Sequence, residues 1–207
     1  MINKNLKNNV SVVRTVTQYP VFPYDVDSEI KQALLDVFSG MGLSRENPFS
    51  TYISPGQSVL IKPNWVRDRN PLGFDIESLI THPSIIKYVL DFLAIAMEGK
   101  GKIIIADAPL QNCNFENLKK NIRLDEIVET FNKQNPSIEL IVEDWRITTI
   151  PNSKLNIRDI QKFRITDNED IKKEYNIIDM AENSFLEDIS EYSNRFRVTK
   201  YKPSLMQ

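Results

Sequence analysis

Cysteine and histidine are scarce in this sequence. Its 207 residues include one cysteine, Cys113, and one histidine, His82. A single cysteine excludes an internal disulfide, which agrees with a reducing compartment. One cysteine and one histidine also fall short of the ligand sets that zinc and iron–sulfur sites require. The sequence therefore predicts no zinc or iron–sulfur site, and no residue is assigned to a metal. Cys113 is expected to be inert, because nothing near it in the sequence except a helix start would lower its pKa.

Glycine is also scarce, with 6 residues in the whole chain. No G-x-G-x-x-G run follows any expected strand, so the sequence lacks the phosphate-binding loop of dinucleotide-binding proteins. A related topology alone does not restore that function. The sequence therefore names no cofactor.

Neither sign of charge dominates, and long apolar runs are missing. With 26 basic and 28 acidic residues the net charge is −2, so no overall field attracts nucleic acid. No run approaches the roughly 18 apolar residues of a membrane span, and the polar residues 1–9 contain no signal-peptide core. We expect a cytoplasmic protein without a nucleic-acid or membrane partner, and its oligomeric state stays open.

The central part of the predicted fold consists of two short apolar runs joined by an amphipathic helix. Residues 58–61 are typical of a strand buried on both faces of a parallel sheet, and Pro63 ends it. A helix is predicted with Thr81 or His82 near its cap and Pro83 at its first position, and it carries apolar residues at three- and four-residue spacing. Residues 102–107 form a second buried strand. This pattern predicts a right-handed βαβ unit.

The same alternation continues after the second strand. Asn112 or Asn114 can cap a helix that is broken near Arg123, and residues 138–144 form a third strand. The resulting βαβαβ order predicts an α/β fold with a Rossmann-like, mostly parallel sheet flanked by helices.

The amino-terminal part adds two further expected elements. Residues 10–16 are rich in β-branched side chains and are predicted to be a strand of the same sheet. A helix capped by Asp27 or Ser28 is predicted to run to about Phe38.

We predict a single α/β domain over residues 1–207. It begins with a flexible leader (1–9) and continues as an α/β core (10–145). Residues 146–207 change texture, with short β-prone runs between turn residues, and predict a β-rich extension packed on the sheet.

The core resembles the DUF362 family, a group of bacterial and archaeal proteins without an established general function. The resemblance covers about residues 10–145 and rests on three runs in this order: Val59-Leu60-Ile61-Lys62-Pro63-Asn64, Thr81-His82-Pro83 and Ile103-Ile104-Ile105-Ala106-Asp107-Ala108-Pro109. It implies a prokaryotic, metabolic protein and identifies no reaction.

The later motifs of the family are missing from this sequence. These are a strand ending in an asparagine-leucine-proline-lysine type motif, a lysine-threonine-histidine triplet and a lysine-asparagine segment. The resemblance therefore implies the amino-terminal half of a longer protein, or a chain that has lost the half completing the site. The ferredoxin-like cysteine clusters of some relatives are not carried over, because this chain has one cysteine.

Polar side chains follow each predicted strand at its carboxyl end, where open α/β sheets bind ligands. Lys62 and Asn64 follow the first strand, Asp107 ends the second and Asp144 ends the third. A lysine and an asparagine suit a phosphate or carboxylate, and Asp107 is a candidate catalytic base. The alternative is that Lys62 and Asp107 form a partly buried ion pair that ties the strand ends together.

A long irregular stretch between Trp65 and Ile80 lies where it would cover a ligand at this edge. Arg67 and Arg69 in this stretch are candidate ligand-binding residues, because a guanidinium can hold an anion through two hydrogen bonds. The alternative is a solvated loop whose arginines pair with acidic neighbours in the same loop, Asp68 and Asp75.

His82 is the other candidate catalytic residue. At a helix start its pKa would be lowered by the helix dipole, leaving a neutral ring able to exchange a proton. The alternative is a helix-cap residue packed by Pro83.

Two functions follow from these residues. The first is an enzyme, or part of one, that binds a small anionic metabolite at the carboxyl edge of the sheet. The second is a noncatalytic binding or assembly module that requires a partner chain or a missing carboxyl half. An exposed apolar patch would favour the second function.

Overall fold

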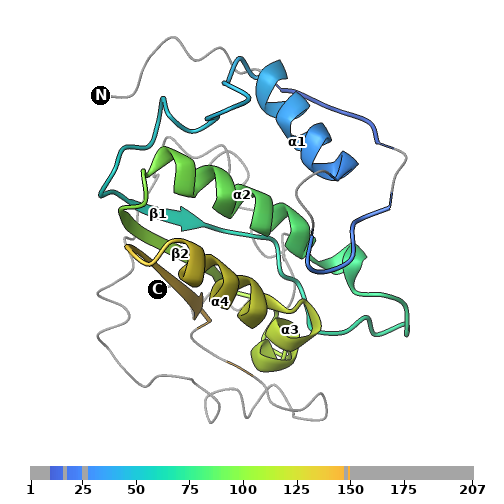
Figure 1. Cartoon of the computed structure of the whole chain (residues 1–207). Coiled ribbons are helices and arrows are strands. Elements are labelled where there is room, and N and C mark those ends of the chain that lie inside the picture. Colours follow the sequence, from blue (N-terminus) through green and yellow to red (C-terminus); the bar gives the residue numbers. More distant parts are fainter. Residues whose placement is uncertain (1–9, 16–17, 25–27, 147–148, 150–207) are drawn as a thin grey trace, which may run out of the picture. The chain divides into compact units, whose positions relative to one another are not determined.

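The computed structural model describes residues 10–15, 18–24, 28–146 and 149 (Figure 1). The chain divides into two compact units, 1–166 and 167–207, and every described residue lies in the first. The elements along the chain are α1 (Glu29–Gly40), β1 (Ser58–Ile61), the 3-10 helix η1 (Glu77–Leu79), α2 (Pro83–Ala96), β2 (Gly101–Asp107), α3 (Phe115–Asn121), α4 (Leu124–Gln134) and β3 (Ile138–Asp144). The predicted α/β class is confirmed.

The three strands form one parallel sheet in the order β1-β2-β3. The register aligns Leu60 with Ile104 and Ile104 with Ile141. Parallel neighbours need crossover connections, which α2 and the α3–α4 pair supply. Asp107 and Asp144 are register partners at the ends of their strands, so they lie at the same edge of the sheet.

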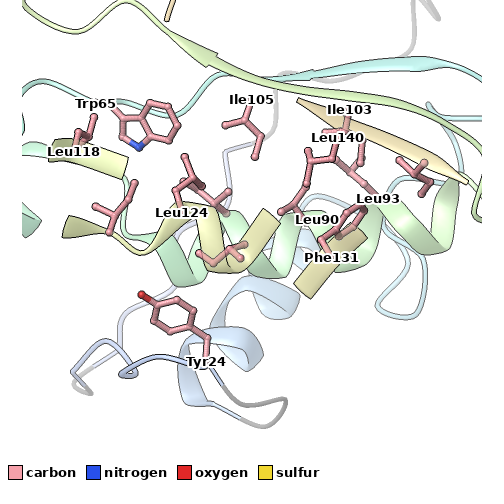
Figure 2. Close-up of a cluster of buried hydrophobic side chains, with 14 of the residues drawn as sticks. Tyr24, Trp65, Leu90, Leu93, Ile103, Ile105, Leu118, Leu124, Phe131 and Leu140 are labelled. Atoms are coloured by element: carbon pink, nitrogen blue, oxygen red, sulfur yellow. The ribbon is translucent and has the colours of Figure 1, made fainter. Parts of the chain in front are cut away.

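One face of this sheet packs against α2 and α4. The core joins Leu90 and Leu93 of α2 with Phe131 of α4 (Figure 2). On the sheet side the same cluster contains Ile103 and Leu140. Each of these side chains is at most 7% exposed. The three- and four-residue apolar spacing of the helices therefore did predict the layer that covers this face.

The first helix packs on α2 rather than on the sheet. Ser28 is its N-cap, and Ser28 Oγ accepts a backbone N–H of the first turn at 3.1 Å. Ile30 and Phe38 are buried in a second, smaller cluster with Phe92 of α2. The predicted helix is confirmed, and α1 forms an outer layer over α2.

The predicted break near Arg123 separates two helices, α3 and α4. Arg123 has a φ of 54°, in the left-handed region that interrupts a right-handed helix. Asn114 caps α3 by accepting the backbone N–H of Asn117 at 3.0 Å. Leu118 and Leu124, on either side of the break, are fully buried, so the chain bends while both helices keep contact with the core.

The prediction that the strands are buried on both faces is wrong for the described residues. Leu60 is 48% exposed, and its register partners Ile104 and Ile141 are only partly buried. Lys102 and Glu139 form a 3.1 Å ion pair on the same face. A continuous apolar run shows that both faces tolerate burial, but it does not show that a second layer is present.

The predicted strand at residues 10–16 is also wrong over its described part, because residues 10–15 form no strand. Val10 and Val12 are 87% and 86% exposed. Strand preference is mostly a preference for packing against neighbouring strands, and this segment pairs with none. The leader (1–9) and nearly all of the predicted β-rich extension lie outside the described residues.

Candidate functional site

Asp107 is heavily bonded at the carboxyl edge of the sheet. Its Oδ2 accepts the backbone N–H of Trp65 at 2.7 Å, and its Oδ1 accepts that of Ala108 at 2.8 Å. Lys62 Nζ lies 2.8 Å from the same Oδ1. Both carboxylate oxygens are thus used, and Asp107 ties the loop after β1 to the end of β2. The ion pair expected as the alternative for these two residues is present.

Lys62 differs from its partner in exposure. The Lys62 side chain is 63% exposed, whereas that of Asp107 is 6% exposed. The ammonium group also donates to the Pro63 carbonyl at 3.4 Å, which leaves one of its three N–H donors for a second anion. Asp107 has no comparable freedom, so the structure favours Lys62 over Asp107 as a ligand-binding group.

The loop that follows β1 has its two ends held together by hydrogen bonds between residues 64–65 and 80–81. Asn64 N–H donates to Thr81 Oγ1 at 2.8 Å, and Thr81 N–H donates back to the Asn64 carbonyl at 2.7 Å. Next to them, Trp65 and Ile80 form an antiparallel bridge. The predicted irregular stretch is thus a loop with a fixed base. Asn64 itself is exposed, which leaves its side-chain amide available to a ligand.

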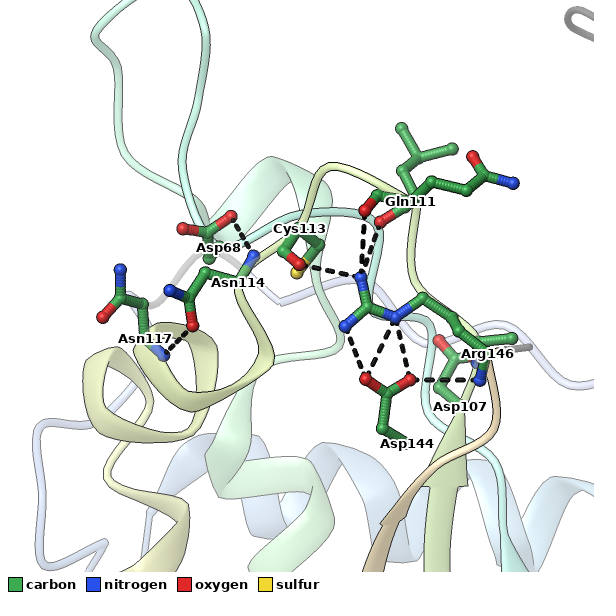
Figure 3. A network of polar contacts seen from close by, with 10 residues as sticks. Asp68, Asp107, Gln111, Cys113, Asn114, Asn117, Asp144 and Arg146 are labelled. Atoms are coloured by element: carbon green, nitrogen blue, oxygen red, sulfur yellow. Dashed lines mark hydrogen bonds and ion pairs between the residues drawn. The ribbon is translucent and has the colours of Figure 1, made fainter. Parts of the chain in front are cut away.

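Asp68 anchors the same loop to α3. Its Oδ1 accepts the backbone N–H of Asn114 at 3.0 Å, and its carbonyl accepts Asn121 Nδ2 at 2.9 Å (Figure 3 shows the first of these contacts). Asp68 is 6% exposed. Because Asp68 lies between Arg67 and Arg69, this anchor fixes the backbone that carries both arginines.

Arg67 and Arg69 have no acidic partner among the described residues. Asp68 Oδ1 accepts the backbone N–H of Asn114, and Asp75 Oδ1 accepts that of Glu77 at 3.0 Å. Arg69 is exposed, while Arg67 is partly buried with an Nε that lacks a hydrogen-bond partner. The alternative in which these arginines pair with acidic residues of their own loop is therefore wrong within the described chain.

A second ion pair at the sheet edge was not predicted. The guanidinium of Arg146 contacts both oxygens of Asp144, with Nε–Oδ1 at 2.8 Å and Nη2–Oδ2 at 2.5 Å (Figure 3). Arg146 Nη1 also donates to the carbonyls of Leu110 and Cys113 at 3.0 and 2.7 Å. With an exposed fraction of 8%, Arg146 fastens the loop after β2 to the end of β3. The signal in the sequence was the spacing Asp-x-Arg at a strand end.

His82 caps α2. Its Nδ1 accepts the backbone N–H of Ser84 at 3.2 Å, and its ring stacks on Tyr19 with centroids 4.1 Å apart. Burial lowers the pKa of His82, and the negative charge of Asp75 opposes that shift. Since Nδ1 accepts a hydrogen bond, the neutral ring carries its proton on Nε2, which lies 3.6 Å from Glu77 Oε1. The helix-cap interpretation agrees with all of these contacts.

Ser84, His82 and Glu77 have the side-chain types of a hydrolytic triad, with Ser84 Oγ 2.8 Å from His82 Nδ1. The burial of these residues does not suit that chemistry, because the serine is enclosed and the glutamate is exposed. Ser84 is fully buried, while the Glu77 side chain is 53% exposed. A nucleophile must reach its substrate, so this arrangement stabilises the start of α2 and does not form a hydrolytic site.

Cys113 lies next to the Arg146 contact. Burial raises the pKa of its thiol to about 11, so it is protonated at neutral pH and a poor nucleophile. Across the described residues, no group of three or more histidine, cysteine or acidic side chains is arranged to hold a metal ion. Within the same part of the chain, no helix is long and apolar enough to cross a membrane.

Comparison with known proteins gives no identification. No known protein family, curated protein or solved structure matches the chain.

Proposed function

We propose that this chain binds a small anionic metabolite at the carboxyl edge of its parallel sheet. The observation that carries the proposal is the pair of arginines, Arg67 and Arg69, on a loop with a fixed base, neither of them neutralised by an acidic side chain of the described chain. Unpaired guanidinium groups on an ordered loop are suited to carboxylate or phosphate recognition. Lys62 and Asn64, which precede Arg67 by five and three residues along the chain, add two further exposed donors.

The geometry supports binding more than it supports a particular reaction. Asp107 is held by two backbone N–H groups and Lys62, and His82 is held at the start of α2. These contacts give Asp107 a structural role at the sheet edge and His82 one at the helix start. We therefore propose an enzyme, or part of one, whose described residues supply ligand recognition and assign it no catalytic residue.

We also propose the finer features of the fold. The strand order β1-β2-β3 with helical crossovers supports half of a Rossmann-like arrangement. Membership of the DUF362 family, a prokaryotic origin, a cytoplasmic location and a β-rich extension after residue 146 are further proposals. They rest on the sequence patterns that led to them.

The open face of the sheet favours the second function, a noncatalytic assembly module. Leu60, Ile104 and Ile141 form an apolar row across the three strands that no described helix covers. All-parallel sheets normally have both faces covered. A monodisperse monomer that does not bind a dye for apolar surfaces would contradict this second function.

Thermal unfolding with a panel of anions tests the proposed binding. Phosphate, sulfate, pyrophosphate and citrate are compared with chloride at the same ionic strength, because a ligand that binds only the folded chain raises its Tm. At least one polyvalent anion is expected to raise the Tm in a saturable way. Identical Tm values for all anions at matched ionic strength would remove the proposal.

A further inference from the structure

The segment that leads from the sheet edge to the two loop arginines is fixed to other parts of the chain. The backbone N–H of Trp65 donates to the carboxylate at the end of β2 at 2.7 Å. The Val66 carbonyl accepts a backbone N–H of the loop after β2 at 3.1 Å. Asp68 makes the next contact, and it stands between Arg67 and Arg69 in the sequence. The placement of both arginines therefore depends on what holds Asp68.

Asp68 ties this segment to both ends of α3. Asn114 immediately precedes the helix, and Asn121 is its last residue. The first donates its backbone N–H to Asp68 Oδ1 at 3.0 Å, and the second donates its side-chain amide to the Asp68 carbonyl at 2.9 Å. These partners are 46 and 53 residues away along the chain. A short helix distant in sequence thus holds the backbone between the two arginines.

Arg67 shows that its placement is imposed by its surroundings. Its Nε is buried and has no hydrogen-bond partner among the described residues. A buried N–H without an acceptor is unfavourable, so contacts nearby have to hold it there. The contact of the adjacent Asp68 with α3 is positioned to do so, and a bound anion would supply the missing acceptor.

By its charge alone, Asp68 would weaken the binding of an anion. Asp75 and Glu77, farther along the same loop, are exposed carboxylates that oppose an anion in the same way. Any effect of Asp68 in favour of binding must therefore come from its hydrogen bonds and not from its charge. The two effects have opposite signs, so experiment can separate them.

We infer that Asp68 is the positioning residue of the proposed anion site. Through Asp68, α3 holds Arg67 and Arg69 in one arrangement before the ligand arrives, so binding does not include the cost of ordering the loop. The inference rests on the proposed function, because it concerns the same two arginines. It adds that α3 acts on the site through Asp68 without contacting the ligand.

Two substitutions at position 68 test this inference. Asp68→Asn removes the charge but keeps an oxygen that can accept the Asn114 N–H, whereas Asp68→Ala removes both. Inorganic phosphate and citrate are titrated calorimetrically into each variant and into the unchanged chain, with affinities referred to the folded protein. Asp68→Asn is expected to bind at least as tightly as the unchanged chain. Asp68→Ala is expected to bind about tenfold more weakly.

Two further variants control for charge and for folding. Asp75→Ala removes a carboxylate of the same loop whose hydrogen bond to Glu77 N–H stays within the loop, and it is expected not to weaken binding. Asn121→Ala removes the second contact between α3 and Asp68 without changing any charge. It is expected to weaken binding about threefold, and it decides the question if Asp68→Ala does not fold.

Alkylation of Cys113 measures the release of the loop without any ligand. Cys113 is the one cysteine of the chain and is 5% exposed. Burial, followed by the negative charge of Asp68, raises the pKa of its thiol to about 11, and Figure 3 shows it beside Asp68 and Asn114. Both substitutions at position 68 remove that charge, so the ratio of their rates isolates local opening. Asp68→Ala is expected to react with iodoacetamide at least about tenfold faster than Asp68→Asn.

The outcomes separate this inference from the proposed function. Binding that Asp68→Ala keeps, or that both substitutions strengthen equally, overturns the inference and leaves the anion site intact. Equal alkylation rates for the two variants also overturn it, because the hydrogen bond to α3 then does not hold the loop. If the unchanged chain binds neither phosphate nor citrate, the anion site itself is rejected and the inference with it.

Discussion

Lys62 Nζ and Asp107 Oδ1 lie 2.8 Å apart, yet the two side chains have opposite environments, 63% exposed for the lysine and 6% for the aspartate. The two residues are therefore expected to contribute unequally to the stability of the fold. If Lys62 is removed, Asp107 still accepts two backbone N–H groups. If Asp107 is removed, those two N–H groups lose their acceptor. We conclude that Asp107 belongs to the scaffold of the sheet edge and Lys62 to its surface.

Removing Lys62 is expected to change stability little. Lys62→Ala should lower the free energy of unfolding by less than about 1.5 kcal/mol, since the lysine side of the pair is solvated and Asp107 keeps its two backbone hydrogen bonds. Asp107→Ala should cost about 3 kcal/mol or more, because it leaves the Trp65 and Ala108 N–H groups without an acceptor. Urea unfolding of both variants measures the difference.

The control for this comparison is Lys102→Ala, which breaks the partly exposed pair with Glu139 on the open face of the sheet and should cost about 1 kcal/mol or less. A loss above about 3 kcal/mol for Lys62→Ala would show that Lys62 is a buried structural partner. Lys62 would then be withdrawn as a ligand-binding residue.

Much of the core was predictable from the sequence because local signals carried it. The run at 58–61, the Pro83 helix start, the break near Arg123 and the strand at 138–144 each follow from residue type and spacing. The wrong predictions concern contacts between segments that are far apart in the sequence. Whether residues 10–15 find a neighbouring strand, and whether a second layer covers Leu60, depends on what else packs there.

Arg146 is expected to be more important for stability than any surface arginine. Arg146→Ala should lower the free energy of unfolding by about 3–5 kcal/mol, because the Asp144 carboxylate loses its cationic partner and keeps only the backbone N–H of residue 146, while two loop carbonyls lose their donor. Arg146→Lys should recover only part of this, since an ammonium cannot contact both oxygens in the same planar way.

Arg45→Ala is the matched control, because Arg45 pairs with Asp36 where both side chains are about half exposed (41% and 52%). That change should cost less than about 1 kcal/mol. Equal losses for Arg146→Ala and Arg45→Ala in chemical denaturation would contradict the role given to Arg146.

The cap formed by His82 predicts a dependence of stability on pH. Burial lowers the pKa of His82 in the folded chain, so the unfolded chain binds the proton more readily. Its contribution is complete above the unfolded pKa of about 6.5 and is lost as the pH falls through the lowered pKa of the folded state. Protonation also removes the Nδ1 acceptor that caps Ser84 N–H.

His82→Asn is the informative variant, because asparagine can cap a helix but does not titrate in this range. Unfolding free energies are compared at several pH values between about 5 and 8. The unchanged chain should lose more stability than the variant on acidification. Parallel pH profiles would show that His82 does not titrate with folding.

The two tryptophans provide a simple test of the packing around the sheet edge. Trp65 is 1% exposed and packs against Phe115, whereas Trp145 is 41% exposed. Trp145→Phe should leave emission at short wavelength that acrylamide quenches weakly, and Trp65→Phe should leave the more accessible emission. The reverse order of quenching would contradict the placement of Trp65 in the core.

The candidate site was less predictable than the core. The sequence placed Lys62, Asn64 and Asp107 at one edge because parallel strands end together. It did not show that two backbone N–H groups and Lys62 occupy the Asp107 carboxylate, or that Asp68 bonds to the start of α3 and Arg67 and Arg69 have no acidic partner in the described part of the chain. These outcomes depend on which backbone N–H groups the folded loops bring near each carboxylate.

Isothermal titration calorimetry with the most stabilising anion of the panel tests the central proposal most directly. The anion is titrated into the unchanged chain, into Arg67→Gln with Arg69→Gln, and into Arg45→Gln as a control for general loss of positive charge. We predict saturable binding that the double variant weakens at least tenfold and that Arg45→Gln leaves unchanged. Equal binding by all three proteins, or no binding by the unchanged chain, would contradict an anion site at these arginines.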